Sequence, residues 1–387
     1  MDISPFAGQL PKPSDLIDIP KLIHAYETLQ PDPEVPSQRV HFGTSGHRGS
    51  SFDTSFNENH ILAITQAICL YRKSNEVHGP LFLGFDTHAL SLPAYRTTLE
   101  VLAANDVMVM IAQNQEFTPT PVISRAILSY NKDRTEGFAD GIVITPSHNP
   151  PGEGGFKYNP THGGPAEKQI TDWIQIQANE FLKNNVTDIR RIPFERAIVA
   201  PTTHPFDFVS PYIRDLENII DFDIIRDSKI RIAVNPLGGA GVHYWRPIAD
   251  RYKIDLSVLN PEVDPTFRFM TRDYLELSGR LGDPVYSRTE APASLKQREQ
   301  IGRATERQVR AKVLGGDKVE GILTRAHGND APIGGIKIET KNGWIALRPS
   351  GTEDIYKIYA ESFLGQSHLN ILLREGQDIV KEIFASG

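Results

Sequence analysis

The chain has 387 residues, of which 39% are apolar and 23% are charged. These fractions are typical of folded globular proteins and exclude a disordered or collagen-like chain. The formal net charge of -7 argues against general nucleic-acid binding, because neutralising the phosphates of a polynucleotide requires a basic face. The length exceeds that of one ordinary compact domain, so we expect two to four core-forming units.

The single cysteine, Cys69, lies in an apolar run and is predicted to be a buried, unreactive thiol. One cysteine cannot form an internal disulfide, which favours a reducing compartment. The first residues contain no basic stretch followed by an apolar core, and nowhere do 18 apolar residues run together. We therefore expect a cytoplasmic protein with no membrane span and no membrane partner.

The N-terminal part begins with an arm and continues with alternating strands and helices. Residues 1–40 are rich in proline and aspartate around one amphipathic stretch, IPKLIHAYETL, and are predicted to lie on a domain. From Asn57 apolar residues recur at helical spacing until Gly79 and Pro80 stop the helix. A strand at LFLGFD, a helix at LPAYRTTLEVLAAN and a strand at VMVMIA are predicted to follow.

The same order of strand, helix and strand returns at residues 229–260. Parallel neighbouring strands need a crossover connection, so the N-terminal units are predicted to be α/β, with mixed or parallel sheets flanked by helices. Three short strand candidates and an amphipathic helix near the end predict a C-terminal α+β domain with an antiparallel sheet. The predicted divisions are an arm at 1–40, a first domain at 41–205, a partial second domain at 206–273 and a C-terminal domain at 274–387.

The segment GIVITPSHNPPGEGGFKYN, residues 141–159, carries the strongest chemical signal. Its apolar start predicts a buried strand, and two prolines fix the following turn. Ser147 thus follows a strand exit, where α/β sheets bind ligands, with His148 beside it and Lys157 beyond a glycine-rich stretch. No G-x-S-x-G elbow surrounds the serine, and its cationic neighbours suit phosphoryl transfer. Spacing alone also fits an ordinary loop serine.

Three motifs occur along the chain in a fixed order: FGTSGHRG at residues 42–49, TPSHNP followed by GFKYN, and RPSGTED at residues 348–354. Together with NPLGGAG and VDPTFRFM they resemble the α-D-phosphohexomutase superfamily. Longer segments, VHYWRPIA and GNDAPIGGIK among them, resemble its bacterial phosphoglucomutases specific for α-D-glucose phosphates. The resemblance covers nearly all of the chain, on either side of one break.

The resemblance implies a role for each residue of the serine loop. Ser147 would carry the transferred phosphate, and His148 and Lys157 would surround it as proton-handling and charge-stabilising groups. Arg48, in TSGHRG, would approach the same phosphoryl group; without the resemblance it would be interpreted as a solvated loop arginine. The glycines of that motif, Gly43, Gly46 and Gly49, are interpreted as residues that shape the backbone.

The motif RPSGTED is expected to bind the phosphate that is not being transferred. Arg348 offers a planar fork of donors, and Ser350, Gly351 and Thr352 add hydroxyl and backbone donors within one turn. In isolation the segment would be interpreted as an Arg-Pro turn that closes a strand. The two distant motifs favour the binding role that the resemblance implies.

The resemblance is interrupted at residues 269–273, which run directly into YLELSGRLGDPVYSR. A full family member here completes its second domain, presents a loop with three aspartates and adds a third domain. That loop would hold Mg²⁺ against the phosphate of Ser147, and one phosphate oxygen is not a magnesium site. We therefore expect the aspartate ligands to be absent and turnover to be strongly impaired, because the transferred phosphoryl group loses its cation.

Two further expectations concern the partial second domain. Asp221, Asp223 and Asp227 are spaced like a metal-binding loop but precede a strand, and we predict helix-cap and surface roles for them. Two strands and one helix leave an apolar edge without cover, so we predict a loosely ordered region from about Ile230 to Asp283.

Three functional hypotheses follow. The first is an isomerase, an intramolecular phosphotransferase that interconverts glucose 1-phosphate and glucose 6-phosphate through a phosphoserine, with glucose 1,6-bisphosphate as intermediate and activator. The second is a truncated, non-catalytic relative that binds phosphosugars or protein partners. The third is an incomplete gene product, which a cooperative unfolding transition would contradict. The expected partner is a phosphorylated hexose and not a nucleic acid, and a homodimer is left open.

Overall fold

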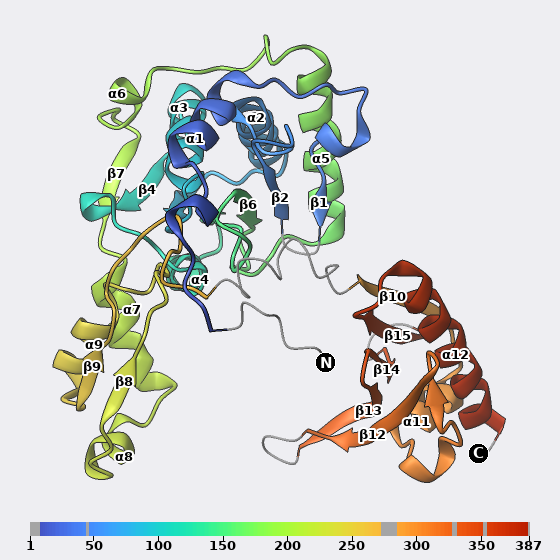
Figure 1. Ribbon diagram of the computed structural model, residues 1–387. Helices are drawn as coiled ribbons and strands as arrows, with labels where there is room; N and C mark the ends of the chain where they lie inside the picture. Colours follow the sequence, from blue (N-terminus) through green and yellow to red (C-terminus); the bar gives the residue numbers. More distant parts are fainter. Residues whose placement is uncertain (1–7, 44–45, 272–284, 327–330, 351–353, 386–387) are drawn as a thin grey trace. The chain divides into compact units, whose positions relative to one another are not determined.

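The computed structural model describes residues 8–43, 46–271, 285–326, 331–350 and 354–385 of the chain. Their contacts divide the chain into two compact units, one formed by Leu10–Met270 and another that contains Thr271–Gly387 (Figure 1). Each unit has its own hydrophobic core.

The first unit begins with a mixed sheet and its helices. Its elements are α1 (Ile19–Thr28), β1 (Phe42–Gly43), β2 (Gly46–Ser50), α2 (Glu58–Ser74), β3 (Leu81–Phe85), α3 (Ser91–Ala104), β4 (Val109–Ala112), α4 (Thr120–Asn131), β5 (Asp140–Ile144), β6 (Glu153–Asn159), α5 (Lys168–Lys183), α6 (Phe194–Ala197) and β7 (Thr203–Phe206). It continues with α7 (Val209–Asp215), α8 (Phe222–Asp227), β8 (Ile232–Val234), α9 (Trp245–Tyr252) and β9 (Leu256–Val258).

Seven strands form the main sheet, in the order β1-β2-β6-β5-β3-β4-β7. Strand β3 pairs in parallel with both β4 and β5, and β4 pairs in parallel with β7. On the other side, β6 runs antiparallel to β5 and to β2. The sheet is therefore mixed, which confirms the predicted α/β class and the predicted strand, helix and strand unit at β3, α3 and β4.

The main sheet is covered by helices on both faces. Side chains alternate across a strand, so Leu81, Leu83 and Phe85 face the core formed with α1, α2, α3 and α5, whereas Phe82 faces α4 and α7–α9. Cys69 of α2 is buried in the first of these cores, as predicted, and burial raises the pKa of its thiol to about 12. The loop after β5 thus leaves a sheet that is packed on both sides.

The predicted second unit is present as β8, α9 and β9, with the two strands parallel and in a separate two-stranded sheet. Beside it lies an apolar hollow of about 430 Å³, lined among others by Tyr212, Phe222 and Trp245. Ile224 and Ile230 are 68% and 59% exposed. Two strands are fewer than an independently stable sheet needs, so much of this region's stability comes from its packing against α4 and the main sheet.

The acidic residues before β8 have the roles predicted for them. Asp221 caps α8, where its carboxylate accepts hydrogen bonds from the backbone N–H groups of Asp223 and Ile224. Asp223 and Asp227 are exposed and lie beside Arg226 of the same helix. None of these carboxylates stands at a strand exit.

The second unit contains β10 (Val285–Pro292), α11 (Leu295–Gly302), β11 (Val313–Leu314), β12 (Asp317–Arg325), β13 (Pro332–Thr340), β14 (Gly343–Pro349), β15 (Ile355–Ser362) and α12 (Gln366–Ala385). Single 3-10 turns, η1 (Pro13–Asp15), η2 (Pro36–Gln38), η3 (Gln113–Gln115), η4 (Leu216–Asn218) and η5 (Glu306–Gln308), connect elements in both units.

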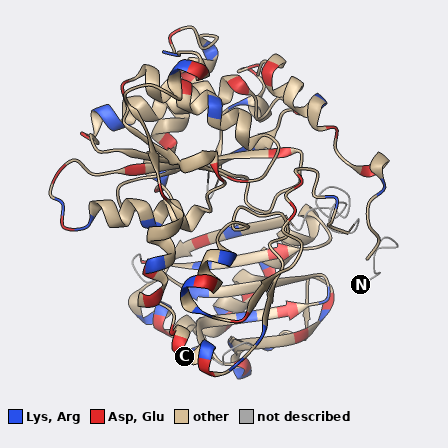
Figure 2. Cartoon of the chain, turned by 90° about the vertical axis from the view of Figure 1, so that its left-hand side faces the viewer, with Lys and Arg blue, Asp and Glu red and all other residues tan. Residues whose placement is uncertain are grey.

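An antiparallel sheet in the order β10-β15-β14-β13-β12-β11 forms the second unit, with α11 and α12 contributing to its core. This confirms the predicted α+β domain and its three strands β13, β14 and β15. Strands β10 and β12 were not predicted, because β10 is an edge strand and neither has a buried residue. In Figure 2, acidic and basic residues are interspersed along the strands of this sheet.

No helix within the described ranges is long and apolar enough to cross a membrane.

Amide exchange measures the local stability of the β8–β9 sheet. We expect its backbone amides to exchange ~10²-fold or more faster than those of β3 and β5, because few apolar contacts hold the two-stranded sheet in place. Hydrogen exchange followed by mass spectrometry of peptides from residues 230–271 gives the measurement. Uniformly slow exchange in those peptides would contradict the predicted loose order; residues 272–283 lie outside the described part of the chain.

Candidate functional site

The loop that carries Ser147 begins where β5 ends, at Ile144. The N–H of Thr145 still donates to the carbonyl of Gly155 on β6, at 2.8 Å, and the N–H of Ser147 donates to Oγ1 of Thr145, at 2.9 Å. A Cβ at Gly155 would lie 2.2 Å from the carbonyl oxygen of Thr145, so only glycine permits this approach. Ser147 itself is exposed.

Ser147 has an unusual backbone conformation, with φ at 71°. A non-glycine residue in this left-handed region costs about 1–3 kcal/mol and persists only where the surrounding structure enforces it. Thirteen other described non-glycine residues share this region, so the case for a functional loop rests on the contacts of Ser147.

Lys157 of β6 reaches the serine directly, with Nζ 2.7 Å from Oγ of Ser147. The antiparallel pairing of β5 and β6, in which Lys157 lies opposite Val143, brings the lysine to the end of β5. Burial lowers the pKa of the ammonium, the charge of Arg48 lowers it further, and the carboxylate of Asp86 acts in the opposite direction. Lys157 is therefore a charged donor at Oγ that gives up its proton more readily than an exposed lysine.

Arg48 lies on the neighbouring strand β2, where its Cα is opposite Gly155. The preceding Gly46 has φ at 128°, and a Cβ there would lie 2.9 Å from Cγ of Lys157. Glycine at this position therefore allows β2 to lie close to the lysine. The structure thus brings Arg48, Lys157 and Ser147 into one region of the first unit, and His148 is exposed beside Ser147.

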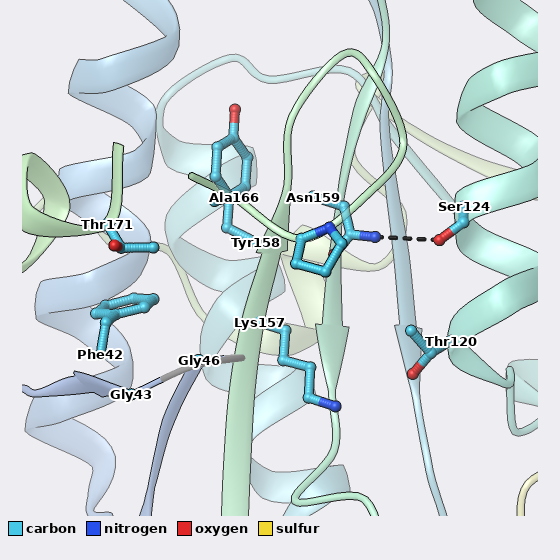
Figure 3. A pocket seen from close by; sticks show the side chains of 11 residues that line it. Phe42, Gly43, Gly46, Thr120, Ser124, Lys157, Tyr158, Asn159, Ala166 and Thr171 are labelled. Atoms are coloured by element: carbon cyan, nitrogen blue, oxygen red, sulfur yellow. Dashed lines mark hydrogen bonds between the residues drawn. The ribbon is translucent and has the colours of Figure 1, made fainter. Parts of the chain in front are cut away.

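A hollow of about 100 Å³ opens beside Lys157 (Figure 3). Lys157 extends between Gly46 and Thr120 of α4, and Nδ2 of Asn159 donates to Oγ of Ser124 at 3.2 Å in the wall. Most of the wall is apolar, formed among others by Phe42 and Tyr158, and Lys157 is the charged side chain in it.

A buried ion pair supports the two strands that carry the loop. Nη1 of Arg72 lies 3.0 Å from Oδ1 of Asp140, at the start of β5, and the hydroxyl of Tyr158 on β6 donates to Oδ2 at 2.7 Å. Both charged side chains are almost fully buried. Burial raises the pKa of Asp140 to about 6, while Arg72 and Tyr158 act to lower it, so the carboxyl is ionised at neutral pH.

The predicted phosphate-binding residues lie in the other compact unit. Arg348 is exposed near the end of β14, and Ser350 is buried just beyond it, with its N–H donating to the carbonyl of Ile355 at 3.0 Å. Gly351 and Thr352 lie outside the described residues. Arg298 of α11, which no sequence motif marks, donates from its guanidinium to the carbonyl of Ser350 at 3.4 Å and to Asp354 at 2.7 Å.

The donors around Ser147 do not fit a magnesium ion. Mg²⁺ is bound by hard oxygens, whereas the side chains placed here are the ammonium of Lys157 and the guanidinium of Arg48. The nearby carboxylate of Glu153 accepts a hydrogen bond from Asn149 at 2.7 Å. Within the described ranges, no three side chains of His, Cys, Asp or Glu gather into a group that could hold a metal ion.

Two family models match the chain, one in each compact unit. A family model described as "Phosphoglucomutase/phosphomannomutase, alpha/beta/alpha domain I" matches residues 39–184. A second, described as "Phosphoglucomutase/phosphomannomutase, C-terminal domain", matches residues 288–375.

Relatives and solved structures agree with these matches. The chain is 37% identical to a phosphoglucomutase of Komagataeibacter xylinus, over 544 residues that cover 99% of this chain and 98% of the relative. It is 27% identical to phosphoglucomutase 1 of Drosophila melanogaster over 228 residues, 53% of this chain and 39% of that one. The chain belongs to the phosphoglucomutase/phosphomannomutase family and is an isomerase of the phosphohexomutase type.

Two solved structures share the fold. A phosphoglucomutase from Paramecium, parafusin, has a TM-score of 0.53 at 15% identity, covering 92% of this chain and 96% of its own. A putative phosphomannomutase from Thermus thermophilus has a TM-score of 0.54 at 15% identity, covering 91% of this chain and 100% of its own. The Komagataeibacter alignment, at 544 positions, is 157 longer than this chain of 387 residues, so at least 157 of its positions have no residue here.

The buried pair beneath the loop predicts a pH-dependent loss of stability. Replacing Arg72 by methionine should lower the free energy of unfolding by about 3–5 kcal/mol near pH 7.5, because Asp140 remains buried without its cation. In the variant the native state binds the Asp140 proton at a pH above that of wild type, so the loss should shrink as the pH falls towards about 5. Urea unfolding at both pH values measures it.

The matched control is the same Arg72→Met replacement made in an Asp140→Asn background, so that the resulting double variant leaves no carboxylate unpaired. There the cost should be much smaller and nearly independent of pH. Equal costs in the two backgrounds would show that packing of the arginine stem, and not the ion pair, supports β5 and β6.

Proposed function

We propose that the chain performs phosphoglucomutase-type phosphoryl transfer between glucose 1-phosphate and glucose 6-phosphate, with Ser147 as the residue that carries the phosphate. The observation that carries the proposal is the contact between Nζ of Lys157 and Oγ of Ser147, 2.7 Å apart, on a serine held in a strained loop. Membership of the family supports it, since the relatives are named phosphoglucomutases.

The first half of the reaction moves the phosphoryl group from Ser147 to the sugar. The 6-hydroxyl of glucose 1-phosphate attacks the phosphorus, the bond from phosphorus to Oγ breaks, and glucose 1,6-bisphosphate forms. Negative charge develops on Oγ, where Lys157 stands as a donor, and the proton lost by the hydroxyl balances the one that Oγ gains. The lowered pKa of Lys157 makes it a suitable proton donor to the leaving oxygen.

The second half returns a phosphoryl group to the serine. The bisphosphate turns round and Oγ of Ser147, giving up its proton, attacks the phosphorus on the 1-position. The bond from that phosphorus to the 1-oxygen breaks, the 1-oxygen takes up a proton, and glucose 6-phosphate leaves. Arg48 and His148 are assigned to the transferred group. The charge of Arg48 lowers the pKa of Lys157, and His148 is next to Ser147 in the chain. Arg348 and Ser350, with Gly351 and Thr352, are assigned to the phosphate that stays, since a guanidinium can bind it with two hydrogen bonds.

We also propose that turnover is strongly impaired, because this chain has no counterpart of the aspartate loop that would hold Mg²⁺. The cationic donors around Ser147 and the 157 alignment positions without a residue support this. Loss of a catalytic cation commonly costs several kcal/mol of transition-state stabilisation, which corresponds to roughly 10³-fold in rate. A family member that binds phosphosugars without turning them over is the second candidate, and the same donor set favours it.

A coupled assay for glucose 6-phosphate, with Mg²⁺ and glucose 1,6-bisphosphate present, tests the reaction. We expect a rate roughly 10³-fold below that of the Komagataeibacter relative, measured in parallel, and none from Ser147→Ala. Intact mass should show one phosphate on the wild-type chain after incubation with the bisphosphate and none on the variant. A rate equal to the relative's would contradict impairment, and an unphosphorylated wild type would contradict the role of Ser147.

Lys157 can be tested without turnover. Lys157→Met should slow phosphorylation of Ser147 by the bisphosphate by about 10²–10³-fold, because the charge that forms on the transferred group loses its donor. Time courses of intact mass give the rate. Lys157→Arg keeps the charge and should fall between Lys157→Met and wild type, since its fork places the donors differently. Unchanged phosphorylation in Lys157→Met would remove the lysine from the mechanism.

The cytoplasmic location stays a prediction. Formation of a homodimer stays open.

A further inference from the structure

A buried carboxylate behind the Ser147 loop accepts four hydrogen bonds from three residues. Asp86 follows β3, and its Oδ1 accepts from the backbone N–H of His88 at 3.0 Å and from Oγ of Ser91 at 2.6 Å. Its Oδ2 accepts from Oγ1 of Thr145 at 2.5 Å and from Nδ1 of His88 at 3.0 Å. Asp86 is 8% exposed, so these bonds are shielded from water.

Two of these partners hold the serine loop from either side of Ser147. Oγ1 of Thr145, while donating to Asp86, accepts the backbone N–H of Ser147. Nε2 of His88 donates to the carbonyl oxygen of Asn149, at 2.9 Å. The loop is thus tied to one carboxylate through the residue two before the serine and the residue two after it.

The tie through His88 is an ion pair. Both ring nitrogens face acceptors, so both carry a proton and the ring is an imidazolium. Burial alone lowers the pKa of His88, but Asp86 raises it above its ordinary value, with smaller help from Asn149 and Glu153. Burial alone raises the pKa of Asp86, but His88 lowers it below its usual value. The ring of Phe267 packs against the imidazolium, with 4.9 Å between centroids.

We propose that Asp86, His88 and Thr145, here called the Asp86 clamp, are positioning residues that hold Ser147 in its strained conformation, aimed for phosphoryl transfer. The proposal deepens the function proposed above and rests on it. A left-handed serine relaxes unless its surroundings enforce the conformation, and the clamp fixes the backbone on both sides. The serine oxygen must meet a phosphorus within a narrow range of distance and angle, so small displacements are costly.

The test uses isosteric variants of the full-length chain. Thr145→Val keeps the shape of the side chain and removes the hydroxyl between Asp86 and the N–H of Ser147. We expect phosphorylation of Ser147 by glucose 1,6-bisphosphate to slow by about 10–100-fold at saturating bisphosphate, with an unchanged half-saturating concentration. Thr145→Ser retains the hydroxyl and should stay close to wild type. His88→Phe, which cuts the tie to Asn149, should behave like Thr145→Val.

Ser91→Ala is the matched structural control. It removes a hydrogen bond from the same carboxylate, yet the Ser91 hydroxyl donates to Asp86 and not to a residue of the loop. Its midpoint of thermal unfolding should fall about as much as that of Thr145→Val, while its phosphorylation rate stays near that of wild type. Equal slowing in Ser91→Ala and Thr145→Val would overturn the clamp, since loss of stability would then explain both.

Amide exchange separates failure of the clamp from failure of the proposed function. If the wild-type chain takes no phosphate from the bisphosphate, the proposed function fails, and the clamp is judged by exchange at Ser147, His148 and Asn149. Faster exchange at all three in Thr145→Val and in His88→Phe, with no change in Ser91→Ala, supports the clamp. Exchange that is unchanged, or that changes equally in Ser91→Ala, overturns it.

Discussion

The contact between Lys157 and Ser147 depends on one structural constraint, the antiparallel pairing of β5 and β6. The two strands are joined by the serine loop itself, so their register decides which side chain of β6 returns to the end of β5. A shift of one residue would turn Lys157 to the opposite face of the sheet. Glycines at positions 46 and 155 let the flanking backbone approach, because a Cβ at either would collide with a neighbouring strand or loop.

Two buried ion pairs support this pair of strands, one at each end. Arg72 and Asp140 join a helix to the start of β5, away from the loop, and their burial makes the pair sensitive to loss of either partner. Asp86 and His88 lie at the other end, where the strands leave the sheet, and they engage the loop on both sides of the serine. A single hydrophobic sheet thus carries ionic supports at both ends of the strands that present the serine.

The region of β8, α9 and β9 packs against the main sheet. Its strands β8 and β9 form a separate sheet, yet their core is shared with α4 and the main sheet, so they add burial to the unit that contains Ser147. The cost is an apolar hollow with exposed isoleucines beside it. The main sheet has its own core on the opposite face, formed with α1, α2, α3 and α5, and so does not depend on β8 and β9 alone.

The sequence by itself determined the α/β and α+β classes, the helix after Asn57 and the buried strand before Ser147. The spacing of apolar residues and the backbone restriction by proline depend only on residues close together in the chain. It also proposed Ser147, Lys157 and Arg48 through motifs, and the tertiary structure then placed them together. The Asp86 clamp, Arg298 and the polar strands β10 and β12 could not be predicted, since no local pattern marks them. The clamp and Arg298 depend on contacts between segments far apart in the chain, Asp86 with Thr145 and Arg298 with Ser350, which only folding brings within hydrogen-bonding distance.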